Sequence, residues 1–160
     1  MLQGKNVLVT GASAGIGAAL ARELALHGAN LVLAARRRDR LDALAAELGA
    51  RVRVLAVEVD VTRDGSVEAA VAAAERELGG LDIAIANAGF AVTGPAERLS
   101  LDDYRRQLET NVLGVLRTIY AALPALKQRR GQIVVMGSVS GHVPAAGLSA
   151  YAASKFAVRA

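Results

Sequence analysis

One stretch decides the fold, T-G-A-S-A-G-I-G at Thr10–Gly17. It follows an apolar run that predicts a strand, Asn6–Thr10, and opens into a segment with helical spacing. Glycines let a backbone approach a pyrophosphate closely, and the free N–H groups and positive dipole of a helix start favour negative charge. The stretch therefore predicts a phosphate-binding turn between a strand and a helix, although an ordinary Gly-rich turn has the same composition.

The rest of the chain alternates apolar, β-branched runs with helical patterns. Three helical patterns end at glycines, and a longer one, at 101–130, contains Pro124, which is expected to end or kink it. A final helix begins near Tyr151. The runs that predict strands are 6–10, 30–34, 52–59, 82–86 and 133–136.

Strands that are apolar on both faces and separated by helices predict a parallel sheet covered on both sides. The fold class is therefore α/β, with a doubly wound sheet. The run 52–59 is expected at an edge, because Arg53 and Glu58 interrupt its apolar residues. No repeat or linker divides the sequence, so residues 1–160 are expected to form a single domain.

The composition argues against several classes of protein. Hydrophobic residues make up 53% of the chain and charged residues 21%, as in a globular domain. There is no Cys and only two His, so we expect no disulfide and no metal site. The net charge is +4, but the arginines form no stripe that would indicate nucleic-acid binding. No apolar stretch reaches the ~18 residues of a membrane span, and Met1 leads directly into a strand, so a cytoplasmic protein is expected.

The spacing of the glycines at 11, 15 and 17 differs from G-x-G-x-x-G, and T-G-x-x-x-G-x-G resembles the short-chain dehydrogenase/reductase family. The resemblance continues through N-A-G at 87–89, where Ala86 replaces a first Asn, and through Y-x-x-x-K at 151–155. It implies a Rossmann-type fold with strand order 3-2-1-4-5. It also implies an NAD(P)-dependent oxidoreductase that interconverts an alcohol and a ketone or aldehyde of small-molecule size.

The resemblance also indicates how a cofactor would bind. NAD-binding relatives carry an acidic residue at the end of the second strand, where this chain has Ala35 followed by Arg36 and Arg37. A guanidinium suits a 2′-phosphate, so NADP is favoured over NAD, although Ala14 stands where NADP-preferring relatives often have another basic residue. Asp60 matches a position that meets adenine, or it caps a helix. The implied cofactor residues are Gly11, Ser13, Gly15, Ile16, Gly17, Arg36, Arg37, Asp60, Val61, Asn87, Ala88, Gly89, Tyr151 and Lys155.

Reduction of a ketone by hydride leaves an alkoxide that needs a proton, which a phenol can donate. Because the pKa of a phenol is about 10, a nearby ammonium is needed to stabilise the phenolate. Tyr151 and Lys155 are four residues apart and project from one helix face, as a surface packing pair would also do. By resemblance, Tyr151 is the general acid/base, and Lys155 supplies the charge and binds the nicotinamide ribose.

Two more residues complete the set that the resemblance implies. Ser138, after the fifth strand, would orient the substrate oxygen, with Ser140 as a competitor for this role and a turn serine as the structural alternative. Asn111 would kink its helix and hold a water of a proton relay, or it is a core Asn with satisfied hydrogen bonds. The catalytic residues expected are thus Asn111, Ser138, Tyr151 and Lys155, without a metal ion.

The chain ends at Ala160, five residues after Lys155, whereas the family adds further helices and strands. The domain is therefore expected to be incomplete at its C-terminus, with the later strands missing. Two hypotheses follow: the chain is part of an active reductase, or it is a truncated, inactive fragment that binds nucleotide. The complete protein is expected to form a homodimer or homotetramer.

Overall fold

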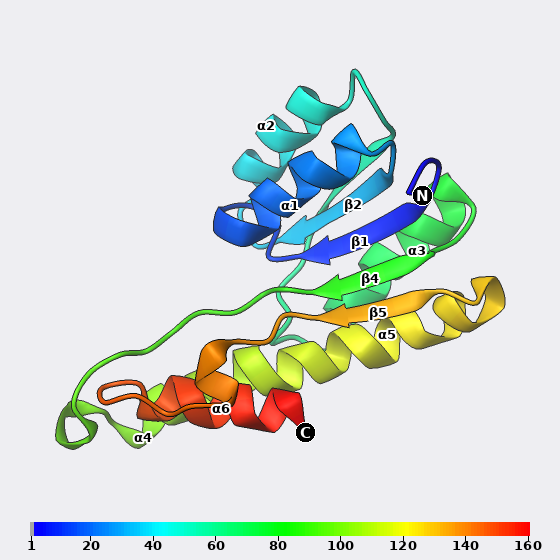
Figure 1. The fold of residues 1–160 in the computed structure, drawn as a ribbon. Coiled ribbons are helices and arrows are strands. Elements are labelled where there is room, and N and C mark those ends of the chain that lie inside the picture. The colour runs from blue at the N-terminus through cyan, green and yellow to red at the C-terminus, as the bar shows by residue number, and fades with distance from the viewer. Residues whose placement is uncertain (1) are drawn as a thin grey trace.

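The computed structural model describes residues 2–160 and has a five-stranded parallel sheet at its centre. The strand order is β3-β2-β1-β4-β5, so the predicted fold class and strand order are confirmed (Figure 1). The register pairs Val7 of β1 with Leu31 on one side and with Ile83 on the other. The strands are β1 (Asn6–Thr10), β2 (Asn30–Ala35), β3 (Val54–Glu58), β4 (Ile83–Ala86) and β5 (Gln132–Val135).

Helices cover both faces of the sheet because the strands present apolar side chains on each face. On one face, Val9 and Leu33 pack with Leu24 and Leu41 from helices α1 (Gly15–Leu26) and α2 (Arg38–Leu48). On the other face, Leu8 and Val32 pack with residues of α3 (Ser66–Leu78) and α5 (Gly114–Arg129). The central strands are thus buried on both sides, as a doubly wound sheet requires.

The predicted helices and strands are present, with shifts at their ends. The third strand is shorter than predicted and lies at the sheet edge, as expected from Arg53 and Glu58. Helix α1 buries Ala21 and Leu24, whereas Ile16 in its first turn is 66% exposed. The side chain of Ile16 lies on the cavity described below.

The segment predicted as one helix at 101–130 is divided by a π-helix. Helix α4 (Leu101–Leu108) begins at a capping box between Ser100 and Asp103, and a π-helical turn (Glu109–Leu113) joins it to α5. Helix α5 does not end at Pro124. Proline removes the hydrogen bond to the carbonyl of Tyr120, but that residue is 70% exposed, so water can pair with this carbonyl.

The last helix, α6 (Ser149–Arg159), packs against α4 and the π-helix and lies beyond the carboxyl ends of the strands (Figure 1). Short 3-10 turns lie in the loop between β4 and α4 (Ala96–Arg98) and in the loop between β5 and α6 (Val139–Gly141). Binding sites of open α/β sheets form at this edge. Within residues 2–160, no helix is long and apolar enough to span a membrane.

Candidate active site

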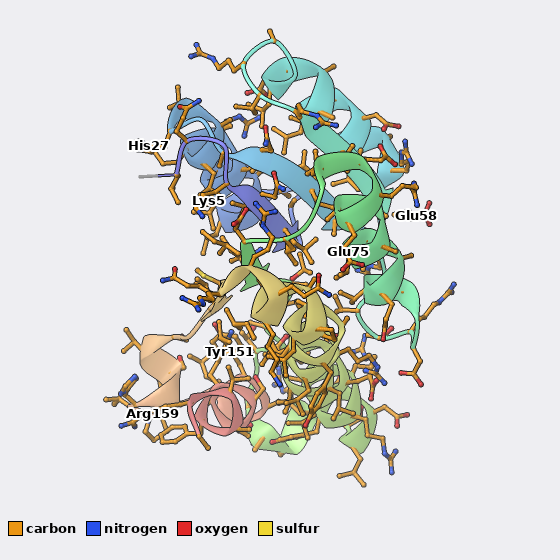
Figure 2. All side chains as sticks on the ribbon, turned by 90° about the vertical axis from the view of Figure 1, so that its right-hand side faces the viewer. Lys5, His27, Glu58, Glu75, Tyr151 and Arg159 are labelled. Atoms are coloured by element: carbon orange, nitrogen blue, oxygen red, sulfur yellow. The ribbon has the colours of Figure 1, made fainter. Side chains whose placement is uncertain are left out.

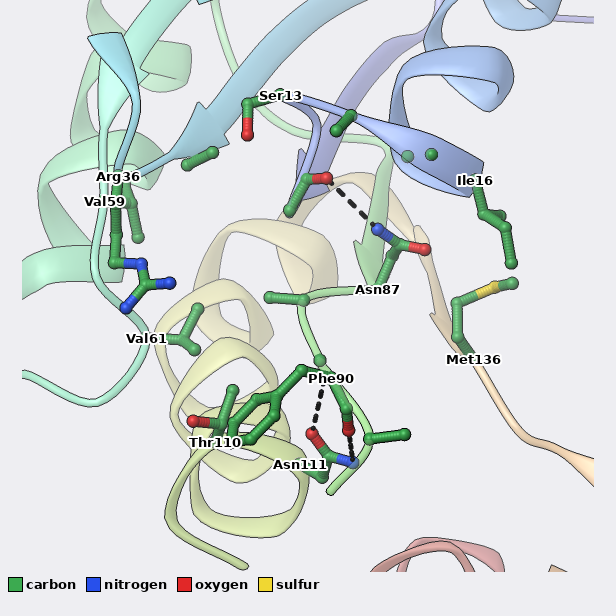
Figure 3. A pocket seen from close by; sticks show the side chains of 18 of the residues that line it. Ser13, Ile16, Arg36, Val59, Val61, Asn87, Phe90, Thr110, Asn111 and Met136 are labelled. Carbon is green, nitrogen blue, oxygen red and sulfur yellow. Dashed lines mark hydrogen bonds between the residues drawn. The ribbon is translucent and has the colours of Figure 1, made fainter. Parts of the chain in front are cut away.

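A cavity of about 510 Å³ opens at the carboxyl ends of the strands (Figure 3). Residues from the loops after β1, β2, β3, β4 and β5, from the π-helix and from α6 line it. All fourteen cofactor residues expected from the sequence are among its lining residues, as are three of the four expected catalytic residues: Asn111, Tyr151 and Lys155.

The three glycines of the stretch Thr10–Gly17 are needed for different structural reasons. A Cβ on Gly11, whose φ is +71°, would lie 2.8 Å from the Cα of Ala88, and a Cβ on Gly17 would lie 2.4 Å from the Gly11 carbonyl oxygen. The fold itself therefore requires both. A Cβ on Gly15 would meet no atom within 4 Å, although its φ of +55° favours glycine. Gly15 thus lines the cavity with open space around its Cβ direction, at the start of a helix whose N-cap, Ala14, provides no side-chain hydrogen bond.

The cavity is basic where β2 ends. Arg36 points into it near Val61, as Figure 3 shows, and Ala35 brings no carboxylate. Arg37 donates from Nε and Nη2 to the Oγ of Ser13, at 3.2 and 2.9 Å. These bonds join the end of β2 to the glycine loop and hold one guanidinium over this end of the cavity.

Asp60 follows β3 and lines the same end of the cavity. Burial disfavours its carboxylate, but hydrogen bonds from the N–H (3.0 Å) and hydroxyl (2.7 Å) of Thr62 outweigh this, with help from the charges of Arg36 and Arg63, so the pKa of Asp60 is lowered. Asp60 does not cap α3, because that helix begins at Ser66 after Gly65.

Asn87, Ala88 and Gly89 line the middle of the cavity, where they are held against the end of β1. Asn87 donates from Nδ2 to the Thr10 carbonyl at 2.9 Å. The Thr10 hydroxyl oxygen accepts from the N–H groups of Asn87 and Ala88 at 3.1 and 3.2 Å. Ala86, which replaces the first Asn of the motif, is a buried residue of β4.

Asn111 lies in the π-helical turn and is 1% exposed. Its Oδ1 accepts from the Phe90 N–H at 3.1 Å, and its Nδ2 donates to the Phe90 carbonyl at 3.0 Å (Figure 3) and to the Ser154 Oγ at 3.1 Å. The irregular turn therefore coincides with the residue for which a kink was expected, and the amide ties three segments together.

Tyr151 and Lys155 lie on the cavity side of α6, and Figure 2 shows Tyr151 facing the rest of the molecule. The Nζ of Lys155 lies 5.9 Å from the centre of the Tyr151 ring and donates to the Met136 carbonyl at 2.6 Å. Lys155 is only 9% exposed, and this burial lowers the pKa of its ammonium. The pair is therefore not a surface packing pair.

Ser138 lies just outside the cavity. Its Oγ accepts from the Ser140 N–H at 3.1 Å and so caps the short turn Val139–Gly141. Its neighbour Gly137 lines the cavity, whereas neither Ser138 nor Ser140 does. Asn111, Tyr151 and Lys155 thus line one cavity, whereas the Ser138 hydroxyl caps the turn Val139–Gly141.

Sequence reasoning missed several cavity residues that have no motif of their own. Phe90 directly follows the N-A-G turn and Met136 follows β5, so both could have been expected from their places after strands. Gln107, which is completely buried behind the cavity wall, gave no signal, because a glutamine in a polar helical pattern is typical of a surface.

The sequence profile described as short chain dehydrogenase matches residues 5–160. The chain belongs to the short-chain dehydrogenase family. The short-chain dehydrogenase described here is 44% identical over 160 residues to the oxidoreductase UcpA of Salmonella typhimurium. The alignment covers 98% of this chain and 60% of that protein. It is 36% identical to the serine 3-dehydrogenase of Agrobacterium fabrum, covering 96% of this chain and 61% of the relative. It thus spans about 60% of the length of these relatives.

Solved structures show the same fold. An alcohol dehydrogenase from Thermococcus sibiricus, complexed with 5-hydroxy-NADP, is 37% identical with a TM-score of 0.93, over 97% of this short-chain dehydrogenase and 67% of that chain. An NAD+-bound xylitol dehydrogenase is 31% identical with a TM-score of 0.93, over 98% and 62%. These neighbours bind different nicotinamide cofactors.

Proposed function

We propose that the chain carries the cofactor-binding and catalytic groups of an NAD(P)-dependent oxidoreductase that interconverts an alcohol and a ketone or aldehyde. The observation that carries this proposal is the shared cavity, which has a glycine-lined helix start, an arginine-rich end and the Tyr151–Lys155 pair. We also propose that residues 1–160 form one domain that is completed in a longer protein.

The cavity fits a dinucleotide. The open space at Gly15 and the uncapped start of α1 suit a pyrophosphate, since a side chain there would fill the place of the phosphate. Asp60 and Val61 would hold the adenine end, and Asn87, Tyr151 and Lys155 the nicotinamide end. When bound, the nicotinamide would donate or accept the hydride.

The residues of the chain would handle the proton. Tyr151 would donate it from its hydroxyl to the oxygen of the reduced carbonyl and take it back in the reverse direction. Lys155 would stabilise the phenolate with a buried ammonium, which the Met136 carbonyl holds in place. Asn111 would position the turn beneath them, and Ser138 would orient the substrate oxygen after release of its bond to Ser140.

We propose NADP as the preferred cofactor. Arg36 and Arg37 provide two guanidinium groups at the end of β2, and Ala35 gives no carboxylate to repel a 2′-phosphate. The Asp60 carboxylate lies close enough to Arg36 to respond to its charge, but the hydrogen bonds of Asp60 go to Thr62. The donors of Arg36 therefore stay available for a phosphate.

Turnover tests the proposal. Oxidation of NADPH would be measured with a panel of ketones, for this chain and for a form extended beyond Ala160. We expect reduction that Tyr151→Phe abolishes, with Tyr120→Phe as the matched control because Tyr120 is 70% exposed on α5 and does not line the cavity. Binding of NADPH without turnover by the short form, beside an active extended form, would support the alternative of an inactive nucleotide-binding fragment. Failure of both forms to bind NADPH would contradict the proposal.

We further propose that the complete protein is a cytoplasmic homodimer or homotetramer. Leu113 at the end of the π-helical turn and Leu116 and Tyr120 on α5 expose 43%, 40% and 70% of their surface, which supports association. Light scattering on the extended form would test this, and a monomer at micromolar concentration would contradict it.

A further inference from the structure

The segment after β4 lines the cavity with irregular backbone. Phe90 and Ala91 are both exposed on it. Within the described part of the chain, residues 88–93 make no backbone–backbone hydrogen bond, and the Gly94 N–H then donates to the Gly147 carbonyl at 2.8 Å. A segment with few backbone hydrogen bonds opens easily unless side chains hold it.

Two side-chain amides hold this segment. Gln107 is completely buried, and its Nε2 donates to the Phe90 carbonyl at 2.6 Å while its Oε1 accepts from the Val92 N–H at 2.7 Å. Asn111, four residues later, pairs with both backbone groups of Phe90. Side chains from α4 and the π-helical turn thus supply the hydrogen bonds that a neighbouring strand would otherwise give to this backbone.

The same hydrogen bonds continue to α6. Asn111 donates to the Ser154 Oγ at 3.1 Å, and the Ser154 hydroxyl donates to the Tyr151 carbonyl at 2.7 Å. A series of hydrogen bonds therefore runs from the Val92 N–H to Gln107, from Gln107 to the Phe90 carbonyl that it shares with Asn111, and from Asn111 through Ser154 to the turn of helix that carries Tyr151.

We propose that Gln107 is a positioning residue of the active site, which fixes the cavity wall at Phe90 and Ala91 relative to Tyr151. The inference rests on the function proposed above for Tyr151. A buried amide is costly unless both of its ends are paired, and Gln107 uses both ends on one cavity-lining segment. Its role is therefore to hold the position of a backbone that a carbonyl substrate would contact.

The first test compares Gln107→Met with the wild-type chain by NMR, without cofactor. Methionine keeps the length of the side chain and removes both hydrogen bonds. We expect exchange of the Val92 amide to become about tenfold faster, as for the loss of one net hydrogen bond. We also expect the ring signals of Tyr151 to shift, because its helix is joined to the same series. Gln128→Met, at an exposed site on α5, should change neither signal.

Gln107→Glu serves as the second variant. Because the site is completely buried, the pKa of the new carboxyl group should be raised, so at low pH the neutral acid keeps both an acceptor for the Val92 N–H and a donor toward the Phe90 carbonyl, and on ionisation at higher pH it loses the donor. Relative to the wild type at the same pH, the Tyr151 signals should match at low pH and shift as the carboxyl ionises, while exchange at Val92 stays slow. This variant decides the matter if Gln107→Met does not fold. Tyr151 signals and Val92 exchange that match the wild type in folded Gln107→Met, or Tyr151 signals that match it at every pH in Gln107→Glu, would overturn the proposal. Failure of the wild-type chain to bind NADPH would instead overturn the proposed function, since these NMR readouts need no cofactor.

Discussion

Gly15 and Gly17 are both in the first turn of α1, yet their replacement should have different consequences. In Gly17→Ala the new Cβ would lie 2.4 Å from the Gly11 carbonyl oxygen, a backbone atom, so we expect a loss of about 3 kcal/mol or more in the free energy of unfolding. In Gly15→Ala the methyl group meets no protein atom, and only the φ of +55° opposes it, at a cost of about 1–2 kcal/mol. Urea denaturation of both variants would measure this difference.

For NADPH binding, Gly15 should be the more sensitive of the two positions in a chain that stays folded. In Gly15→Ala the methyl group occupies open space on the cavity, where a phosphate is proposed to lie, so NADPH affinity should fall although the chain stays folded. Fluorescence titration with NADPH would show it, with Gly79→Ala as the control: this glycine also has a positive φ (+79°) and an unobstructed Cβ direction, but lies away from the cavity. Unchanged NADPH affinity in Gly15→Ala would contradict the placement of the phosphate.

The buried ammonium of Lys155 is a second case in which stability and function should separate. Burial lowers its pKa below the ordinary 10.5, so between the folded pKa and 10.5 the unfolded chain binds more protons. The free energy of unfolding of the wild type should therefore rise as pH rises through that window. Lys155→Met should lack this rise, should be no less stable than the wild type at pH 7, and should lose turnover. Urea denaturation at pH 7 and 10 would check this, and a clear loss of stability at pH 7 would contradict it.

The cavity residues that the sequence predicted stand in fixed relation to strand ends. Gly11 and Asn87 follow β1 and β4, and parallel strands bring such positions to one edge. Ser138 also follows a strand, but the conformation of its side chain is a local choice, and the Ser140 N–H binds it. Gln107 could not be predicted, because its partners are backbone atoms 17 and 15 residues away in an irregular segment.

At the scale of elements, Asp82 joins the start of β4 to the start of β1 and to the end of α5. Burial disfavours its carboxylate, but bonds from the Asn6 N–H (2.9 Å), Lys5 (3.1 Å) and Arg129 (3.2 Å) outweigh this and lower the pKa of Asp82. A carboxyl group with a lowered pKa stabilises the fold above its unfolded pKa, here about 3.8, and this contribution is lost as pH falls through the folded pKa.

Asp82→Asn should therefore destabilise the fold by about 1–3 kcal/mol at pH 7, as for loss of charged hydrogen bonds to a buried group. The difference from the wild type should shrink as pH falls from 3.8 through the folded pKa, because the wild-type carboxyl then becomes neutral first in the unfolded and finally in the folded chain. Urea denaturation between pH 3 and 7 measures both. Asp42→Asn, in an exposed pair with Arg38, should change stability little and is the control. A pH-independent difference would contradict this interpretation.

The helical pattern at 101–130 shows what sequence reasoning could not give at this scale. A π-helical turn adds one residue to a repeat that still contains suitable apolar positions, so the break at Glu109–Leu113 leaves little trace in the spacing. The strands were predictable because burial on both faces demands continuous apolar runs, which irregular loops do not have.

For the whole molecule, the strand order follows from family resemblance and agrees with the rule that parallel crossovers are right-handed. The residues that line the cavity come from segments along the whole chain, from the loop after β1 to α6. A ligand in it contacts parts that unfolding would separate. Cofactor binding should thus stabilise the entire fold and not one loop.

Thermal unfolding can use this linkage to read cofactor preference. NADPH at 100 times its Kd should stabilise the fold by about 2.7 kcal/mol, which corresponds to a rise in Tm of roughly 5–10 °C for a chain of this size. NADH at the same concentration should raise Tm less, because Arg36 and Arg37 would find no 2′-phosphate to bind. The difference should vanish in the double variant Arg36→Ala/Arg37→Ala and shrink at high salt. Arg38→Ala/Arg40→Ala removes the same charge outside the cavity and should preserve it. Equal stabilisation of the wild type by NADH and NADPH would refute the NADP preference while leaving a nicotinamide site in place.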